Sequence, residues 1–132
     1  MADYDIPEDL RYSNEDEWVR DTGDTAVVGI TDYAQDQLGD IVFVELPEVG
    51  SRLVRGEVFG VIESVKAVSE LCAPIGGNIK TVNGELEDHP EAVNESCYGS
   101  GWIVEITGPD RSEFNSLLDA SEYRRHVDER SE

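Results

Sequence analysis

The sequence predicts a mostly β fold, in which two small antiparallel sheets pack as a flattened sandwich with short helices near both ends. Three observations favour this fold. Between residues 40 and 106 the chain is a series of short β-prone runs, separated by turn signals roughly every 8–12 residues. Helical spacing of apolar residues is restricted to short stretches outside that region. The 132 residues contain no low-complexity segment or linker, so we expect one domain over residues 1–132.

The first 30 residues are expected to form one helical turn and two strands. Residues 7–10 begin with proline, which suits the first position of a helix. Residues 18–20 predict a short strand, and residues 21–24, which include glycine and two aspartates, predict a turn. The run of residues 25–30 is rich in apolar and β-branched side chains and predicts the next strand.

A short helix is expected to follow, over residues 32–38. Thr31 is a residue type that is common at the N-cap of a helix. Ala34 and Leu38 lie four residues apart, so they share one face of a helix. Gly39 occupies the position of a C-cap glycine, which ends the helix.

The central region is predicted to be β throughout. The expected strands cover residues 41–46, 52–54, 58–62, 67–72, 78–82 and 101–106. Turns are predicted at residues 47–50 and 74–77, where proline and glycine occur close together. A further turn is predicted at Asn83 and Gly84, a pair that is common in tight hairpins.

Beyond this region the pattern becomes helical. Pro109 interrupts the β pattern, and three apolar residues then fall at i, i+3 and i+4, the spacing of one helix face. These residues are Phe114, Leu117 and Leu118. Ser121 is expected to cap a final helical piece. We therefore predict a β-rich core over about residues 25–107 and a helical C-terminal segment over about residues 110–129.

The chain is strongly acidic. Asp and Glu number 30 against 10 Lys and Arg, which gives a net charge of −20. Because phosphate groups are bound by Lys and Arg, this composition argues against nucleic acid and anionic membranes as partners. The acid is spread along the whole chain and 39% of the residues are hydrophobic, so we expect a folded core inside a charged shell. We interpret the charge as an adaptation to a salt-rich cytoplasm, as in halophiles.

No segment predicts export or membrane insertion. Residues 1–5 are acidic, and they resemble neither a secretory signal nor a transit peptide. No stretch approaches the roughly 20 apolar residues of a membrane-spanning helix. Cys72 and Cys97 form no CxxC motif and are expected to be reduced thiols, although a disulfide between them stays an alternative. These features predict a cytoplasmic protein.

Lysine is nearly absent from the chain. Lys66 and Lys80 are the two lysines, and the other eight basic residues are arginine. Lys66 lies between two β-prone runs, so we expect it at the exposed tip of a hairpin. Such a lysine suits a carrier, because a modifying enzyme must reach its amine and the attached arm must then move. Lys80 is expected to be structural, in the strand after Gly77.

The segment around Lys66, Glu63-Ser64-Val65-Lys66-Ala67, resembles the lipoylation motif of glycine cleavage H proteins. The resemblance covers nearly the whole chain, and the combined pattern is highly specific. The other matching positions are residues 17–19, 28–31, 34–35, 38–40, 43–50, 73–74, 77, 90–94, 98–102, 116–119 and 123.

The resemblance implies a cofactor and a fold. Lys66 would hold lipoic acid through an amide bond, and Glu63, Ser64, Val65 and Ala67 would form the attachment motif around it. The family fold is a barrel-sandwich hybrid of the lipoyl-domain type, which agrees with the mostly β fold expected from the strand pattern.

The resemblance also implies a carrier in a multienzyme system rather than a catalyst. Its lipoyl group would take the aminomethyl group that the glycine-decarboxylating P protein produces with pyridoxal phosphate. The T protein, an aminomethyltransferase, would pass the one-carbon unit to tetrahydrofolate and release ammonia. Dihydrolipoamide dehydrogenase, the L protein, would reoxidise the dithiol, and a lipoate-attaching enzyme would load Lys66. Glu17 matches a family glutamate at the cleft where the loaded arm is shielded from water.

Two positions depart from the family pattern, and three alternatives stay open. Asp16 stands where the family often has histidine, and Cys97 where it often has proline. A lipoyl module of a 2-oxo acid dehydrogenase usually has Asp before the lysine, where this chain has Val65. A biotin carrier has methionine on both sides of the lysine. The third alternative, an enzyme or a protein that only relays lipoyl groups, is excluded less well than the other two.

Other chemistry is not indicated by the sequence. His89 and His126 are far apart and lack the spacing of metal ligands, so we expect no metal site. The chain has no glycine-rich phosphate loop and no serine or cysteine in a nucleophile elbow. We therefore expect no catalytic residues.

Overall fold

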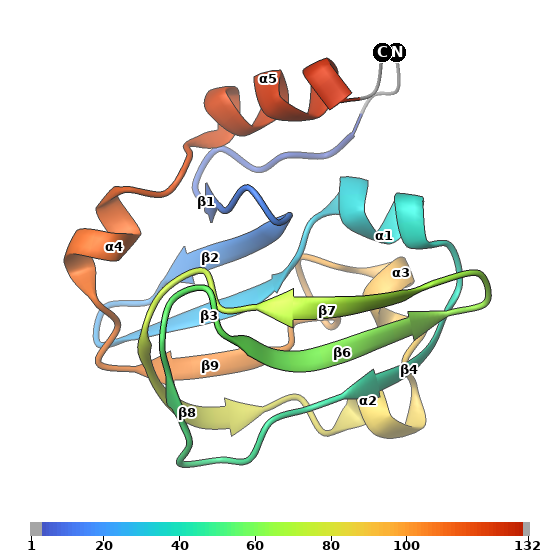
Figure 1. The fold of residues 1–132 in the computed structure, drawn as a ribbon, viewed down its shortest axis with the longest axis horizontal. Helices are drawn as coiled ribbons and strands as arrows, with labels where there is room; N and C mark the ends of the chain where they lie inside the picture. The colour runs from blue at the N-terminus through green and yellow to red at the C-terminus, as the bar shows by residue number, and fades with distance from the viewer. Residues whose placement is uncertain (1–3, 131–132) are drawn as a thin grey trace.

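The computed structural model describes residues 4–130 and shows two antiparallel sheets with short helices around them (Figure 1). Within these residues the strands are β1 Arg11–Tyr12, β2 Glu17–Asp21, β3 Thr25–Ile30, β4 Ile41–Glu45, β5 Arg52–Leu53, β6 Val58–Ser64, β7 Val68–Cys72, β8 Gly77–Val82 and β9 Val104–Thr107. The helices are α1 Asp32–Leu38, α2 Glu85–Asp88, α3 Ala92–Glu95, α4 Arg111–Asn115 and α5 Ala120–Arg130. None of these helices is long and apolar enough to cross a membrane.

The two sheets form a sandwich. The larger sheet has the strand order β1-β2-β3-β9-β8-β5 and the smaller one the order β4-β6-β7. Every strand pair is antiparallel, and the smaller sheet lies across the larger one (Figure 1). Neither sheet closes into a barrel. The predicted mostly β sandwich with short helices is therefore confirmed, whereas the domain boundaries expected from the sequence stay a prediction.

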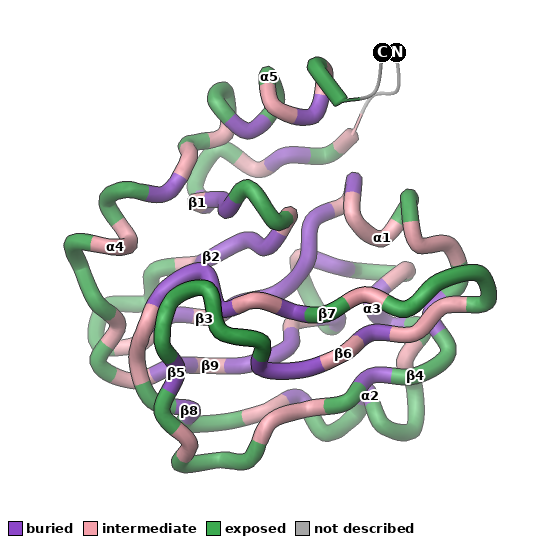
Figure 2. The backbone as a smooth tube through the Cα atoms, in the orientation of Figure 1, coloured by how far each residue is buried: buried purple, intermediate pink, exposed green. Residues whose placement is uncertain are grey.

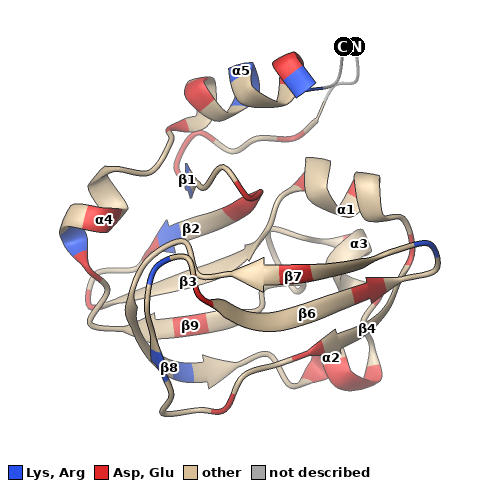
Figure 3. Cartoon of the chain, in the orientation of Figure 1, with Lys and Arg blue, Asp and Glu red and all other residues tan. Residues whose placement is uncertain are grey.

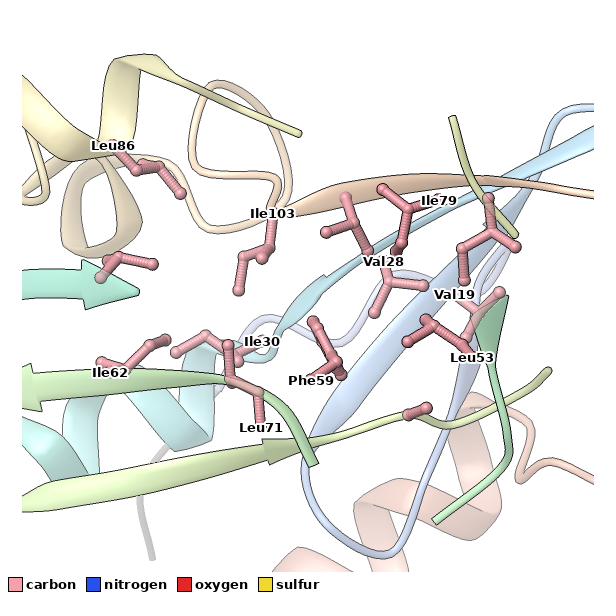
Figure 4. Packing of buried hydrophobic residues seen from close by; sticks show 14 of the residues in the cluster. Val19, Val28, Ile30, Leu53, Phe59, Ile62, Leu71, Ile79, Leu86 and Ile103 are labelled. Atoms are coloured by element: carbon pink, nitrogen blue, oxygen red, sulfur yellow. The ribbon is translucent and has the colours of Figure 1, made fainter. Parts of the chain in front are cut away.

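The main core lies between the two sheets. Val28 and Ile79 of the larger sheet and Ile62 and Leu71 of the smaller sheet are buried in one hydrophobic cluster (Figure 4). Each such side chain contributes roughly 1.5–3 kcal/mol when it leaves water, so the cluster holds the sheets together. Because Ile62 and Leu71 lie on β6 and β7, the same packing fixes the base of the hairpin that these strands form.

A second cluster fixes the C-terminal helix over the N-terminal segment. Tyr12 of β1 stacks on Tyr123 of α5 with ring centroids 4.7 Å apart. Trp18 of β2 and Tyr33 of α1 are buried in the same cluster. Figure 1 shows α5 above β1 and the chain that precedes it. This packing brings the end of α5 close to α1, because Arg130 lies over the Tyr33 ring at 4.7 Å.

Before the last strand, the structure differs from three local expectations. Residues 7–10 form a turn rather than a helical turn. The region between residues 40 and 106 is not β throughout, because α2 and α3 interrupt it. Asn83 and Gly84 do form a turn, closed by the Leu86 amide on the Asn83 carbonyl at 3.1 Å, but it leads into α2 rather than into a paired strand. Asn83 is buried, and its side chain donates to the carbonyls of Ser100 and Trp102. Its side chain thus fixes a loop.

The C-terminal expectations were only partly right. The last strand begins at residue 104 rather than 101. Leu117 and Leu118 were expected on one helix face with Phe114, but both lie beyond the end of α4. Leu118 instead pairs with Tyr12 in an isolated β-bridge. The final helix begins at Ala120 rather than after Ser121. Asp119 caps it, because its carboxylate accepts from the Glu122 amide at 2.8 Å while the Glu122 carboxylate accepts from the Asp119 amide at 2.9 Å.

Candidate functional site

Lys66 lies at the tip of the hairpin between β6 and β7. The strands pair in antiparallel register as far as Glu63 and Val68, and the residues between them form the turn. The tip is exposed in Figure 2, and it is blue in Figure 3, where acidic segments surround it on several elements. This is the position that the flanking β-prone runs predicted for Lys66.

Ser64 shapes the turn that presents Lys66. Its amide donates to the Ala67 carbonyl at 2.8 Å, which closes the turn. Its hydroxyl accepts from the amides of Lys66 at 3.2 Å and Ala67 at 3.0 Å. Short polar side chains commonly satisfy turn amides in this way. Of the other motif residues, Glu63 is half-buried in β6, and Val65 is 68% exposed.

The Lys66 side chain extends over the end of α1. Gly39 follows this helix with φ +81°, a conformation that favours glycine. A Cβ atom at Gly39 would lie 3.3 Å from Lys66 Cε, so the missing side chain also makes room for the lysine stem. The sequence had indicated Gly39 only as a helix cap, because its contact with Lys66 joins segments distant in the chain.

A cleft of about 250 Å³, which we call the acidic cleft, opens between α1, β7 and the start of β2. Its lining includes Leu38, the neighbour of the Gly39 that the Lys66 stem approaches, and Ser69 and Glu70 of the strand that follows the hairpin tip. The lining is Glu15, Asp16, Glu17, Ile30, Tyr33, Ala34, Gln37, Leu38, Ile62, Ser69, Glu70, Leu71 and Arg130. It combines apolar walls with four carboxyl groups and one guanidinium group, which suits a ligand with an apolar stem and a cationic end.

Glu17 is the buried carboxyl group of the acidic cleft. It is 2% exposed, and it accepts from the Ser13 hydroxyl at 2.6 Å and from the Cys72 amide at 3.3 Å. Burial raises the pKa of Glu17 to about 8. The two hydrogen bonds lower this pKa, and the nearby charges of Glu15 and Asp16 raise it by a smaller amount. Glu17 is therefore largely protonated near neutral pH. The structure thus places Glu17 in the same cleft as Ser69 and Glu70 of β7, the strand that follows Lys66, although Glu17 lies far from them in the sequence.

Asp16 and Arg130 form one wall of the acidic cleft. Arg130 donates to the Asp16 carboxylate at 3.1 Å from Nη1, and the Tyr123 hydroxyl donates to the same carboxylate at 2.8 Å. Asp16 has φ +72°, in the left-handed region. The sequence indicated Asp16 only as a departure from the family pattern, and it gave no signal for Arg130 or Glu70, because the fold alone brings them together.

The two cysteines are free thiols in the structure. Cys72 is half-buried and lines a second cleft of about 200 Å³, which shares Glu15 and Glu17 with the acidic cleft. Burial raises the pKa of the Cys72 thiol, and it raises the pKa of Cys97 to about 12. Neither thiol is prepared as a thiolate nucleophile.

The histidines and Lys80 take no part in this site. His89 pairs with Glu91 and Glu95 on the surface, and His126 approaches the Asn14 carbonyl. Among residues 4–130 no group of three or more His, Cys, Asp and Glu side chains could hold a metal ion. Lys80 lies exposed within β8, in the strand where the sequence placed it.

The fold and the site define a class of protein. A small β-sandwich that presents a lysine at the tip of a hairpin, beside a cleft able to receive an attached arm, is a carrier domain for a covalently bound group.

Comparisons with known proteins identify the family within this class. The family model for the glycine cleavage H-protein matches residues 10–130. A glycine cleavage system H protein from Anoxybacillus flavithermus is 56% identical over 94% of this chain and 98% of its own length. A probable glycine cleavage system H protein from Haloarcula marismortui is 51% identical, over 95% and 98% respectively. The chain belongs to the glycine cleavage H-protein family.

A solved structure agrees with this assignment. The crystal structure of a glycine cleavage system H protein from Mycobacterium marinum superposes with a TM-score of 0.82 and 40% sequence identity. The match covers 91% of this chain and 97% of that protein. The resemblance that the sequence motifs carried is thereby confirmed.

Membership of the family establishes the general role of the chain. H proteins carry lipoate covalently on a lysine and serve the glycine cleavage system as non-catalytic carriers. Their partners are the P, T and L proteins and the enzyme that attaches lipoate. The carrier role, the lipoyl cofactor and these partners, all expected from the sequence, are confirmed, whereas the particular lysine stays a prediction.

Proposed function

We propose that Lys66 is the residue to which lipoate is attached. The observation that carries this proposal is the position of Lys66 at an exposed hairpin tip, with its stem over Gly39, the residue after Leu38 of the acidic cleft. Lys80 also reaches solvent, but it lies within β8 between β5 and β9, where the chain cannot project into an active site. The attaching enzyme would bind the turn formed by Ser64, Val65 and Ala67. Glu63 pairs with Val68 and so fixes the strand that leads into this turn.

The acidic cleft is proposed as the resting place of the loaded arm. When attached, lipoate supplies a disulfide that accepts the aminomethyl group and a dithiol that is later reoxidised. The residues of the cleft would hold the cationic amine of that arm, because Glu15, Glu17 and Glu70 line it. Apolar walls from Leu38 and Leu71 would exclude water from it. A cation seated beside Glu17 would favour release of the proton that burial keeps on this carboxyl group.

Replacement of Lys66 separates the carrier role from the fold. Lys66→Arg keeps the charge and the long stem, but a guanidinium group stays protonated and cannot form the amide bond. We expect the variant to accept no lipoate, and glycine decarboxylation reconstituted with the P, T and L proteins to fall to background. Because the site is exposed, the free energy of unfolding should change by no more than about 0.5 kcal/mol.

The matched control is Lys80→Arg, which makes the same substitution at the other lysine. It should accept lipoate and support glycine decarboxylation as the wild type does. If Lys66→Arg were active above background and Lys80→Arg were not lipoylated, the attachment site would be Lys80 and the proposal would be wrong. A large loss of stability in Lys66→Arg would show that the tip lysine has a structural role.

We infer that the protein works in the cytoplasm. The two thiols are free in the structure, and reduced thiols are typical of that compartment. Fractionation of native cells would test this location. We expect the protein in the soluble cytoplasmic fraction, and its recovery in another fraction would contradict the inference.

A further inference from the structure

The hairpin tip is attached to the connection between α1 and β4. The Val65 amide donates to the Asp40 carbonyl at 3.0 Å, and the Lys66 stem lies over Gly39. Ile41, the next residue, begins β4 and pairs with Ser64 at the end of β6. The position of Lys66 therefore depends on where residues 39–41 lie.

Asn94, in the four-residue helix α3, holds this connection on both sides of Asp40. Its side-chain Nδ2 donates to the Gly39 carbonyl at 2.9 Å, and its Oδ1 accepts from the Ile41 amide at 2.9 Å. The other Nδ2 hydrogen is donated to Gln35 Oε1 at 2.9 Å. Both amide hydrogens and the amide oxygen of Asn94 are thus used on α1 and on the residues that follow it.

These hydrogen bonds do more than end a helix. The Gly39 amide already donates to the Gln35 carbonyl at 3.0 Å, so α1 is closed by its own backbone. Asn94 instead binds the polar groups on either side of Asp40. The Asp40 carbonyl is left to accept from Val65, the residue that precedes the lysine.

We propose that Asn94 is a positioning residue for Lys66. This inference rests on the proposed attachment of lipoate at Lys66. Asn94 acts through Gly39, over which the lysine stem lies, and through Asp40, to which the hairpin tip is bound. When Asn94 is truncated, residues 39–41 lose their hydrogen bonds to α3, and the hairpin tip, which is bound to Asp40, is held less firmly. A reacting group misplaced by about 1 Å can lose a factor on the order of 100 in rate.

Lipoylation kinetics test the proposal directly. With lipoate, ATP and a purified lipoate ligase, the Lys66 amine attacks the carboxyl carbon of lipoyl adenylate, AMP leaves, and the amine loses a proton as the amide forms. For Asn94→Ala we expect kcat/KM of this reaction to fall about tenfold. Asn94→Asp keeps the acceptor for the Ile41 amide but places a carboxylate oxygen, which cannot donate, against the Gly39 carbonyl, so we expect its loss to be at least as large.

Asn83→Ala is the matched control. Asn83 also donates twice from its side chain to backbone carbonyls, but these belong to Ser100 and Trp102, not to the connection at residues 39–41. Its truncation should lower stability while kcat/KM for lipoylation changes by less than about twofold. This control separates a loss of positioning from a general loss of stability.

Amide hydrogen exchange supplies a readout that needs no cofactor. In Asn94→Ala the Val65 amide, which is bound to the connection, should exchange at least about tenfold faster. The Ser64 amide, bound within the hairpin to Ala67, should keep its protection. In Asn83→Ala both amides should exchange as in the wild type.

The outcomes are distinguishable. If the wild type is not lipoylated at Lys66, the proposed function fails. If the wild type is lipoylated there but Asn94→Ala and Asn83→Ala react at equal rates with unchanged Val65 exchange, only the positioning role is overturned. Failure of both Asn94 variants to fold would also overturn it, since the residue would then serve the fold as a whole.

Discussion

Glu17 has the most deeply buried carboxyl group of the acidic cleft. It is 2% exposed, and its two hydrogen-bond donors are a hydroxyl and an amide, neither of them a cation. Burial therefore dominates and raises its pKa from 4.5 to about 8. A carboxyl group in this state stays neutral when the cleft is empty and can ionise when a cation approaches.

Glu17→Gln should change how stability depends on pH. The unfolded chain ionises Glu17 near pH 4.5, whereas the folded chain keeps the proton until about pH 8. The wild type therefore loses stability as the pH rises through this window, and the glutamine variant does not share that loss. Between about pH 5 and pH 8 we expect the variant to gain on the wild type by on the order of 2 kcal/mol.

Denaturant unfolding at a series of pH values measures this difference. Glu129→Gln, an exposed acid of α5, is the control and should run parallel to the wild type. Parallel profiles for Glu17→Gln and the wild type would show that the buried carboxyl is ionised throughout.

Among individual residues, the sequence predicted those that lie in short local motifs. It missed residues that reach the site only because the fold brings distant segments together. Lys66 and Glu17 lie in short motifs that a family pattern reveals. Asn94 also lies in a stretch, residues 90–94, that matches the family pattern, but its contact with Gly39 joins distant segments. Arg130 reaches the cleft from the far end of the chain, for which no local pattern exists.

The β2–β3 hairpin positions Glu17 at the cleft, and it depends on a glycine. Trp18 is fully buried, and its indole Nε1 donates to the Cys97 carbonyl at 3.0 Å. Gly29 lies directly opposite Trp18 in the strand register. The indole ring occupies the space where a side chain at Gly29 would stand, so the two residues fit only as a pair.

Gly29→Ala should destabilise the fold by about 2 kcal/mol. The added Cβ would lie 2.5 Å from Cζ2 of Trp18, so either the ring or the strand must move. Gly84→Ala is the control, because nothing lies within 4 Å of a Cβ there and its φ of −62° suits alanine. Thermal melts compare the two variants, and an equal effect of both would contradict the close packing of Trp18 on β3.

Strands and α1 were predictable because their signals are local and regular. β3 and α1 have the predicted bounds, since apolar spacing and the Thr31 and Gly39 caps define them. α2 and α3 have four residues each, too few for a helical period to emerge. Leu118 left the predicted helix face because its pairing with Tyr12 across the molecule decides its conformation.

The whole molecule is a small sandwich under a strongly negative surface. Acidic segments occur on both sheets and on the helices in Figure 3, in keeping with the net charge of −20. Within residues 4–130, Arg111 pairs with Asp21 and Arg130 with Asp16, but the chain as a whole has three acids for every Lys or Arg. Repulsion among the remaining charges opposes compaction unless salt screens it.

Molar salt should therefore stabilise the fold. Screening weakens the repulsion, and salt also strengthens the burial of apolar surface. We expect the melting temperature to rise between low salt and multi-molar potassium chloride. A melting temperature that stays equal or falls in high salt would contradict the halophilic interpretation of the charge.

The central claim is that lipoate is attached at Lys66, and peptide mapping by mass spectrometry of the protein purified from its native host tests it most directly. The two lysines fall on separate peptides once the chain is cleaved between them, so the adduct can be assigned to one of them. We predict a lipoyl adduct on the peptide that contains Lys66 and an unmodified Lys80. A lipoyl group on Lys80, or a biotinyl group on Lys66, would contradict the claim.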